Sequence, residues 1–576
     1  MNGDNSDSRI KIVFFFVILI TCVLSFKLFQ ISVLSHGRYV AMAENQYIFT
    51  KEMPAERGRI YLSEKDVSAS DFNKNYPVAL NIEIYDVNVT PRNIRKPKEA
   101  AAELAKILDL NEGELFNSIN NDKPYLPAIK KGIEKELADK VTDLKLSGVF
   151  LTTSESRIYP EASLASQIIG FVNSENAGQY GIEKSFNDTL SGKSGTTTGE
   201  KDTKGRIIKQ GDTVEGQNGN DVLLTLDRNI QFMAEKKLKE GVEKYECESG
   251  SIIVMDPKTG AIWAMANSPD YNINDFSKLA SEKKEYLFNN PSVTGLYEPG
   301  STFKALIMAA AIDKGIVEPD TQETFGKSVM VMGYEISTAE DKAFGLETMT
   351  DVLVHSDNVG MVWLGDKMGN DVIYDYIKNF GFGEKTNIEL PLEQGGVIRD
   401  KAKWRDINRA TTTFGQGVSI TPLQLISAYQ TIANGGKLMQ PYIVKATKSP
   451  DGKISETIPK EVRQVISTET ATKLSAMMVE VVERGTGKHA KVEGYKTAAK
   501  TGTAQVPNPE GGYFDDTVKI GTLAGYVPAE DPKFVMLVKL DKPKKAEWGE
   551  TSAGPVFGDM SKWLINYLEM RPSAAN

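Results

Sequence analysis

One long apolar run near the N-terminus limits how this chain can fold more than any other feature. Residues 12–34, IVFFFVILITCVLSFKLFQISVL, are 23 positions interrupted by a single charge, Lys27. As a helix the run would extend roughly 34 Å, enough to cross the hydrocarbon core of a bilayer. Lys27 lies toward its distal end, where a long side chain can reach the membrane interface. The run therefore predicts a transmembrane anchor.

The residues beside the run indicate its orientation. Arg9 and Lys11 precede it, which favours a cytoplasmic tail at residues 1–11. A cleaved signal peptide is the alternative, because AMAE at residues 41–44 resembles a cleavage site, but that site lies too far from the run. We see no second span, so we expect a single-pass protein whose remaining residues lie outside the cytoplasmic membrane.

Composition excludes several classes of function. The chain has 576 residues, enough for two or three domains. Its net charge of -9 argues against nucleic acid as the main partner. Two cysteines and three dispersed histidines offer neither a disulfide framework nor a typical metal-binding pattern. A Ser-His-Asp triad stays open, but we interpret His355 and His489 as structural because neither lies in a recognisable motif.

Changes in periodicity suggest a domain boundary near residues 225–245. We assign residues 35–225, which are mixed and charged, to a first domain and residues 226–576 to a second. The segments expected on the two sides are strands at residues 83–91 and 221–227 and helices at residues 99–110 and 228–245.

The second domain begins and ends with strand-like runs around a mostly helical middle. SIIVMDPKTGAIWAMA, which starts at Ser251, has β-rich runs on both sides of the turn sequence DPKTG and indicates a hairpin. The simplest arrangement is a sheet built from both ends of the domain and enclosing the helices, an α+β fold. The C-terminal elements expected are strands at residues 495–506, 520–527 and 534–540 and a helix at residues 556–570.

A lysine occupies an unusual position in YEPGSTFKALIMAAAIDKG, residues 297–315. The uncharged run after Lys304 has no polar face and is typical of a buried helix. Lysine is rarely buried, and a helix N-terminus is unfavourable for a cation. Both effects favour a neutral amine that can act as a base toward Ser301, three residues earlier on the same helical face. The alternative is an N-cap at Ser301 and a surface charge at Lys304.

Two further short patterns become specific through their order along the chain. S-x-x-K occurs three times, K-T-G twice and S-x-N four times, so none is informative alone. The S-x-N copy at Ser356 is the one that falls between Ser301 and the K-T-G at Lys500. The other K-T-G, at Lys258, lies in the hairpin turn and needs no catalytic explanation. The glycine of the second copy lies in a strand, where it often marks close approach by a ligand.

In this order the motifs resemble the catalytic set of penicillin-binding proteins and class A β-lactamases. The chain is similar to the class B penicillin-binding proteins, which are monofunctional D,D-transpeptidases of peptidoglycan synthesis. GSIIVMDPKTGAIWAMANSPDYN, EPGSTFK, FGQGVSITPLQL, AYQTIANGG and AKTGTAQ resemble their transpeptidase domain. AENQ, ERGRIY, RIYP and YGIEKSFNDTLSG resemble their N-terminal pedestal.

The chain departs from this family at three places. YLSEKDVSASD follows RGRI where the family usually has a turn resembling Asp-Arg-Asn-Gly. Ala162 stands where a glycine often follows R-x-Y-P, and Ala499 where a glycine often precedes K-T-G. These departures affect the pedestal more than the catalytic set.

The resemblance implies a fold and a location. The expected transpeptidase domain, residues 226–576, has an antiparallel five-stranded sheet with helices on both faces and a helical subdomain. It follows the anchor of residues 12–34 and an elongated α+β pedestal at residues 35–225. The family acts at the bacterial cell membrane, with a cytoplasmic N-terminus and an extracytoplasmic catalytic domain, and uses no metal or organic cofactor.

The resemblance also implies roles for the three motifs. Ser301 would attack the carbonyl of the penultimate D-Ala of a stem peptide, and neutral Lys304 would take its proton. Ser356 would relay that proton to the leaving amine, while Asn358 holds the substrate amide. Lys500 would supply positive potential.

The residues after Lys500 would bind the other parts of the substrate. Thr501, Gly502 and Thr503 would line the substrate site, with the two threonines on the terminal carboxylate. The backbone N–H groups of Ser301 and Thr503 would form the oxyanion hole.

The implied partners are stem peptides ending in D-Ala-D-Ala, β-lactams, a membrane-embedded glycan polymerase and division proteins. YEPGSTFK and the S-x-N motif resemble the septal branch of the family; the elongation branch is the alternative. Further alternatives are a carboxypeptidase or β-lactamase of the same fold, and a β-lactam sensor or scaffold without transpeptidation.

Overall fold

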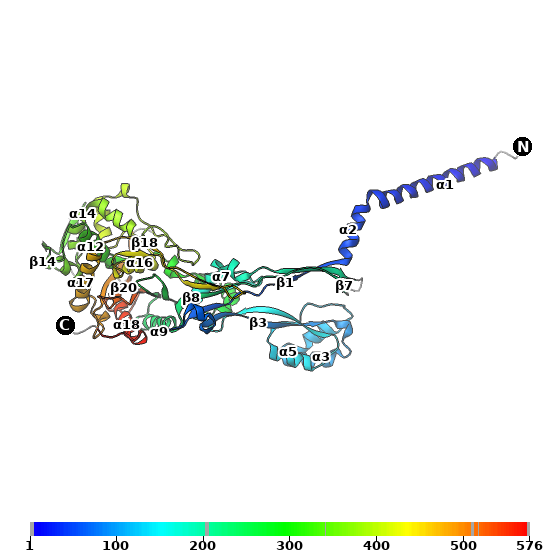
Figure 1. Ribbon diagram of the computed structural model, residues 1–576, viewed down its shortest axis with the longest axis horizontal. Helices are drawn as coiled ribbons and strands as arrows, with labels where there is room; N and C mark the ends of the chain where they lie inside the picture. Colours follow the sequence, from blue (N-terminus) through cyan, green and yellow to red (C-terminus); the bar gives the residue numbers. More distant parts are fainter. Residues whose placement is uncertain (1–4, 202–206, 340, 509–511, 516–517, 573–576) are drawn as a thin grey trace. The chain divides into compact units, whose positions relative to one another are not determined.

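Two parts of the chain pack as separate units in this computed structural model (Figure 1). The first unit consists of Met1–Glu56 and Gly192–Gly219, and the second of Arg57–Ser191 and Asn220–Asn576. The structure describes residues 5–201, 207–339, 341–508, 512–515 and 518–572.

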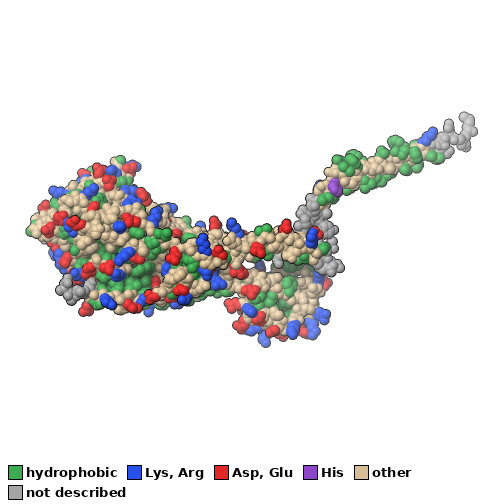
Figure 2. Space-filling model, viewed as in Figure 1, with side chains coloured by type: hydrophobic (Ala, Val, Ile, Leu, Met, Phe, Trp, Pro, Cys, Tyr) green, Lys and Arg blue, Asp and Glu red, His purple; other side chains and the backbone are tan. Residues whose placement is uncertain are grey.

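The first unit contains the apolar run. Its helical segment Ser8–Leu34 is, by length and composition, long and apolar enough to cross a membrane. Apolar side chains cover this helix (Figure 2), and Phe14, for example, is 65% exposed. The segment includes the predicted anchor and is consistent with a single-pass protein. The elements of this unit are α1 (Asn5–Phe29), η1 (Gln30–Leu34), α2 (His36–Tyr47) and an antiparallel sheet of β1 (Ile48–Met53), β6 (Gly195–Lys201) and β7 (Ile207–Val214), in the order β1-β6-β7.

The C-terminal part of the second unit is built on a five-stranded antiparallel sheet in the order β10-β9-β21-β20-β19. Helices α9 and α18 pack on one face of it and α16 on the other, because successive residues of β9 such as Ile252 and Ile253 enter opposite cores. The expected sheet from both ends of the domain is confirmed. The elements are α9 (Arg228–Tyr245), β9 (Ser249–Met255), β10 (Ile262–Ser268), α16 (Pro422–Ala433), β19 (Ala498–Gln505), β20 (Lys519–Val527), β21 (Phe534–Asp541) and α18 (Ala553–Tyr567).

The helical middle also contains short strand pairs that the sequence did not indicate. The strand pairs are β11–β14, β12–β13 and β15–β18. Its elements are α10 (Phe276–Ser281), α11 (Pro291–Thr294), η6 (Gly300–Phe303), α12 (Lys304–Asp313), β11 (Gln322–Phe325), β12 (Ser328–Val331), β13 (Tyr334–Ser337), β14 (Gly345–Thr348), α13 (Met349–Val354), α14 (Asn358–Asn379), α15 (Asp406–Thr413), β15 (Lys437–Met439), β18 (Glu461–Gln464) and α17 (Thr468–Arg484).

The C-terminal helix begins and ends earlier than predicted. α18 starts at Ala553 and not at residue 556, so that Gly554 and Pro555 lie inside its first turn. Proline is tolerated there because the first-turn N–H groups have no intrahelical partner.

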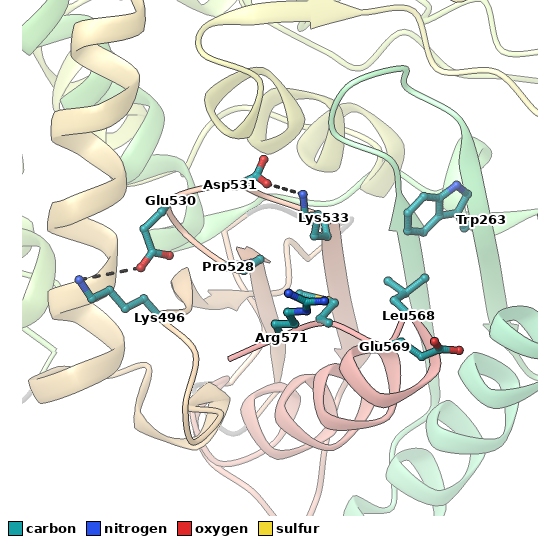
Figure 3. A pocket seen from close by; sticks show the side chains of 10 residues that line it. Trp263, Lys496, Pro528, Glu530, Asp531, Lys533, Leu568, Glu569 and Arg571 are labelled. Carbon is teal, nitrogen blue, oxygen red and sulfur yellow. Dashed lines mark hydrogen bonds and ion pairs between the residues drawn. The ribbon is translucent and has the colours of Figure 1, made fainter. Parts of the chain in front are cut away.

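A surface hollow of about 780 Å³ lies beside the end of α18 and the turn between β20 and β21 (Figure 3). Trp263 and Leu568 give it an apolar wall, and Lys496 pairs with Glu530 across 3.9 Å at its rim. None of the predicted site residues lines this hollow.

The N-terminal part of the second unit is organised by β3, which is 14 residues long. Its first residues pair with β2, and the residues from Leu80 to Val89 pair with β5. Helices α3 and α5 pack against that second half, where Val87 and Val89 are buried with Leu104 (Figure 1). The elements are β2 (Ile60–Ser63), β3 (Tyr76–Val89), α3 (Pro97–Leu108), α4 (Glu112–Ile119), β4 (Lys130–Ile133), α5 (Lys135–Asp143), β5 (Val149–Ile158), α6 (Ser166–Ile169), α7 (Gly181–Ser185), α8 (Asn187–Ser191), β8 (Asp221–Asp227), β16 (Val444–Lys448) and β17 (Ile454–Glu456).

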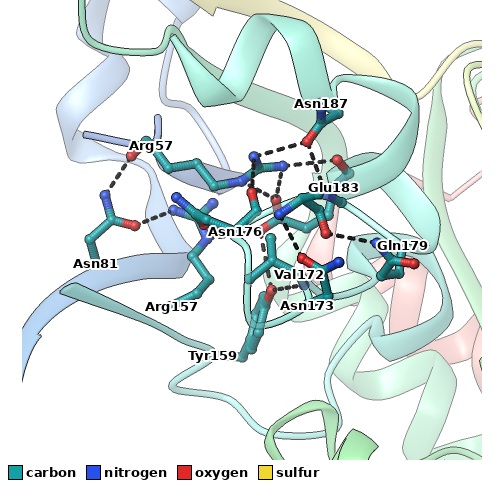
Figure 4. A network of polar contacts seen from close by, with 12 residues as sticks. Arg57, Asn81, Arg157, Tyr159, Val172, Asn173, Asn176, Gln179, Glu183 and Asn187 are labelled. Atoms are coloured by element: carbon teal, nitrogen blue, oxygen red, sulfur yellow. Dashed lines mark hydrogen bonds and ion pairs between the residues drawn. The ribbon is translucent and has the colours of Figure 1, made fainter. Parts of the chain in front are cut away.

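Three pedestal motifs meet in one buried ion network (Figure 4). Arg57 of ERGRIY donates from Nε to Glu183 of YGIEKS at 2.7 Å, and Arg157 of RIYP donates to the other carboxylate oxygen at 2.8 Å. All three side chains are at most 1% exposed. Asn81 links the two arginines, donating to the Arg57 carbonyl and accepting from Arg157. The buried hydrogen bonds among these motifs thus hold the segments around Arg57, Arg157 and Glu183 together.

Ala162 has the backbone conformation that glycine prefers. Its φ is +51°, in the left-handed region. The position at which glycine is common in the family is therefore a tight turn after R-x-Y-P.

We predict that Glu183→Gln destabilises the pedestal by about 3–5 kcal/mol, because two buried guanidinium groups lose the carboxylate that they share. The measurement is the thermal unfolding midpoint of the full-length protein in detergent. The matched control is Glu136→Gln, which breaks an exposed pair with Lys140 and should change stability by about 0.5 kcal/mol or less. Equal shifts for both variants would contradict the structural role given to the network.

Candidate active site

Ser301 is held in the η6 turn, which continues directly into α12. The turn packs closely on β19: a Cβ placed on Gly502 would lie 2.9 Å from the Pro299 carbonyl oxygen, so the strand needs glycine there. On its other side, the Gly300 N–H donates to the Gly415 carbonyl at 3.2 Å. Gly415 has φ +79°, and a Cβ there would lie 2.2 Å from the Gly300 carbonyl oxygen. Ser301 itself stays partly exposed.

Lys304 begins α12 and is fully buried. Its Nζ lies 2.6 Å from the Ser356 carbonyl oxygen, 2.7 Å from Asn358 Oδ1 and 3.2 Å from Ser356 Oγ. Burial lowers the pKa of this amine well below its usual value, and the nearby Lys500 lowers it further. The described hydrogen bonds of the amine go to the S-x-N segment and not to the Ser301 hydroxyl. The spacing of Ser301 and Lys304 along the helix therefore does not by itself join their side chains.

The S-x-N segment is the turn between α13 and α14. Ser356 has φ +57°, a strained conformation for a serine, and the next residue, Asp357, caps α14. Asn358 accepts from Lys304 and donates from Nδ2 to the Ser337 carbonyl of β13 at 2.9 Å. Ser356 and Asn358 are therefore held by partners on α12 and β13.

Lys500 reaches the same hydroxyl from β19. Its Nζ donates to Ser356 Oγ at 3.0 Å and to the Thr501 carbonyl at 3.2 Å. The side chain is fully buried, and burial lowers the pKa of Lys500 to about 7. The structure therefore brings the predicted Lys304 and Lys500 to the hydroxyl of Ser356, and Asn358 binds the Lys304 amine.

The residues after Lys500 continue along an edge strand. In the described part of the chain β19 pairs only with β20, so its outer edge is free of a neighbouring strand. Thr501 Oγ1 lies 2.8 Å from Thr486 Oγ1, and Thr503 Oγ1 accepts from the Gly549 N–H at 2.9 Å. An accepting hydroxyl keeps its proton available for a ligand oxygen.

Sequence reasoning missed Glu298, which precedes the Pro-Gly pair at the head of the helix. It is 7% exposed, and its carboxylate accepts from the Gly417 N–H and from the Tyr513 hydroxyl, each at 2.9 Å. It therefore ties the FGQG segment and the loop after β19 to the Ser301 turn. The motif EPGSTFK contains this glutamate, but no spacing rule identifies its partners.

Comparison with known families decides the identity of the chain. Residues 250–562 match the penicillin binding protein transpeptidase domain, and residues 52–224 match the penicillin-binding protein dimerisation domain.

The chain belongs to the class B penicillin-binding proteins. Stage V sporulation protein D of Bacillus subtilis is 31% identical, over 98% of this chain and 86% of that protein. Peptidoglycan D,D-transpeptidase FtsI of Escherichia coli is 32% identical, over 82% of this chain and 77% of that protein.

Solved structures of penicillin-binding proteins share the fold. Penicillin binding protein 3 of Mycobacterium tuberculosis, crystallised with aztreonam, is 28% identical with a TM-score of 0.70, covering 91% of this chain and 98% of that one. This class B penicillin-binding protein thus has the expected fold, and the matches support a D,D-transpeptidase function.

The two lysines predict the pH dependence of acylation by a fluorescent penicillin. The second-order rate constant should fall as the pH rises through about 7, because Lys500 then loses its positive charge, which we expect to attract the substrate carboxylate. It should also fall at acidic pH, because Lys304 becomes protonated and cannot accept a proton. A profile that is flat from about pH 6 to about pH 9 would rule out this assignment. Lys496→Met, which removes an exposed lysine, should leave the profile unchanged.

Proposed function

We propose that this chain is a serine D,D-transpeptidase that crosslinks peptidoglycan stem peptides through an acyl-enzyme on Ser301. One observation carries the proposal: the amines of Lys304 and Lys500 meet at the hydroxyl of Ser356, at 3.2 and 3.0 Å. These residues come from the three motifs that the family uses for acyl transfer.

The surroundings of Lys304 suit a neutral amine. A neutral amine has two protons to donate and one lone pair. The Ser356 carbonyl and Asn358 Oδ1 take the two protons, which leaves the lone pair for a hydroxyl proton. Burial keeps the amine neutral, since an ammonium ion here would be poorly solvated.

The reaction then proceeds in two acyl-transfer steps. Ser301 Oγ attacks the carbonyl carbon of the penultimate D-Ala as Lys304 takes the hydroxyl proton. The C–N bond breaks, and Ser356 passes that proton to the leaving D-Ala amine. The amine of a second stem peptide attacks the ester, its proton returns to Ser301, and the new amide is the crosslink.

The K-T-G segment supplies the rest of the substrate site. Asn358 holds a substrate amide, and Lys500 with Thr501 and Thr503 binds the terminal carboxylate beside Gly502. The backbone N–H groups of Ser301 and Thr503 stabilise the oxyanion. The close packing of η6 on β19 supports this pairing, because it places the two backbone segments side by side.

The apolar N-terminal helix supports an extracytoplasmic location for this chemistry. Arg9 and Lys11 favour a cytoplasmic N-terminus, so the catalytic domain faces the cell wall as a single-pass protein of a bacterial membrane. β-Lactams are further ligands, which the aztreonam complex of penicillin binding protein 3 supports. The septal-type YEPGSTFK and S-x-N motifs favour partnership with a membrane-embedded glycan polymerase and division proteins.

A second cellular role is transpeptidation during sporulation. The match to stage V sporulation protein D, over 98% of this chain, favours it. Both roles use the same catalytic site and differ in when the protein is needed.

We predict that intact-protein mass spectrometry after mixing with penicillin finds one stable adduct, which peptide mapping places on Ser301. Release by water needs a base that positions a water molecule, and no motif here identifies one. Ser301→Ala should form no adduct. Lys304→Ala should acylate about 10²–10⁴-fold more slowly, because the general base is lost.

The chain contains its own control for this experiment. Ser281 and Lys284 also form S-x-x-K, but Ser281 is solvent-accessible at the end of α10 and donates to the Lys278 carbonyl. Ser281→Ala and Lys284→Ala should therefore acylate at the wild-type rate. Rapid drug turnover without an adduct would assign the chain to the β-lactamases instead.

We predict that depletion of the protein during vegetative growth gives filamentous cells with arrested septa, observed by microscopy. Rounded cells that still divide would instead support the elongation branch. Normal growth with a defect confined to spores would support the sporulation role.

A further inference from the structure

A buried acidic cluster lies under the turn that carries Ser356 and Asn358. Glu347, on β14, has a side chain that is 2% exposed, and Asp357 is fully buried. Glu347 Oε1 lies 2.6 Å from His355 Nδ1, and Asp357 Oδ1 accepts from the Val359 N–H at 2.8 Å. Each carboxyl group therefore has one oxygen with an ordinary partner.

The second oxygen of each carboxyl group lacks such a partner in the described part of the chain. Glu347 Oε2 and Asp357 Oδ2 are buried and have no donor among the described residues. Burial raises the pKa of Glu347, and Asp357 raises it further through a hydrogen bond and through its charge. One proton shared between the two buried oxygens would give each of them a partner, whereas two ionised carboxylates could only accept hydrogen bonds.

The charged neighbours indicate which group holds it. Burial, then Asp357, then Asp351 raise the pKa of Glu347. Asp357, in contrast, caps the N-terminus of α14, where a negative charge is favoured, and it raises the pKa of the nearby Lys304.

The histidine beside Glu347 fits the same assignment. Burial lowers the pKa of His355, and Arg484 and Lys342 act in the same direction against Asp351. A neutral His355 donates its Nδ1 proton to Glu347 Oε1. Phe344 stacks on the imidazole, with the two ring centroids 4.6 Å apart.

We propose that Glu347 is a positioning residue of this transpeptidase, which shares a proton with Asp357 and so fixes the strained turn that carries Ser356 and Asn358. The pair connects β14 to the N-terminus of α14, and an unprotonated pair would place two like charges directly beneath the turn. This inference rests on the roles proposed above for Ser356 and Asn358.

The first test compares the thermal unfolding midpoints of wild type and Glu347→Gln across about pH 5 to about pH 9. Folding of wild type takes up a proton at Glu347, because its folded pKa lies above its unfolded value of about 4.3. That contribution is present at low pH and is lost as the pH rises to the raised pKa. A glutamine donates to Asp357 at every pH, so the midpoint of Glu347→Gln should gain steadily on wild type with rising pH. A difference that is the same at every pH would overturn the proposal.

The second test measures acylation by fluorescent penicillin at neutral pH. Glu347→Gln should stay within a few-fold of wild type, because its amide reproduces both hydrogen bonds. Glu347→Ala should lose about 10- to 100-fold, because the turn is no longer held in place. Glu335→Gln, exposed on β13, is the matched control and should behave as wild type in both tests. Wild-type acylation by Glu347→Ala would overturn the proposal.

The two tests separate this inference from the proposed function. The unfolding comparison needs no catalysis, so it reports the shared proton even if Ser301 proves not to be the nucleophile. A wild-type protein that forms no adduct at Ser301 would refute the proposed function and leave the unfolding result intact.

Discussion

The burial of Lys304 is the constraint on which the catalytic region depends. An amine at the start of an apolar helix has no water to solvate it, so its partners must come from the protein. The helix itself offers none, because its next residues are apolar. The partners come from the turn between α13 and α14. Lys500 of β19 also contacts that turn. A single solvation requirement thus joins three distant segments of the chain.

Burial of charged groups has different consequences in the two halves of the second unit. In the pedestal, Glu183 receives two guanidinium groups, so a buried charge is matched by close partners of opposite sign. In the active site, two lysine amines share one neutral hydroxyl, and burial lowers the pKa of both amines. The first arrangement stabilises structure. The second leaves Lys500 with a pKa of about 7 and favours the neutral form of Lys304, which suits proton transfer.

Close backbone contact provides the remaining precision of the site. Gly502 and Gly415 allow β19 and the FGQG segment to approach the Ser301 turn more closely than any side chain would permit. Glu298 then joins that turn to the FGQG segment and to the loop after β19. Because these contacts involve the backbone or a buried carboxylate, they hold the turn of Ser301, the proposed nucleophile, in place while its side chain stays partly exposed.

The sequence alone determined the apolar helix, the sheet built from both ends of the domain and the order of the three catalytic motifs. Each depends on local patterns: hydrophobic periodicity, turn residues and motif spacing. It could not show that the Lys304 amine is held by Ser356 and Asn358, or that Glu347 lies under their turn. Those contacts join residues that are separated in the chain, and only the packing of β14, α12 and β19 brings them together. α18 likewise starts at Ala553 and not at the predicted residue 556, and its first turn tolerates a proline because the N–H groups there have no intrahelical partner.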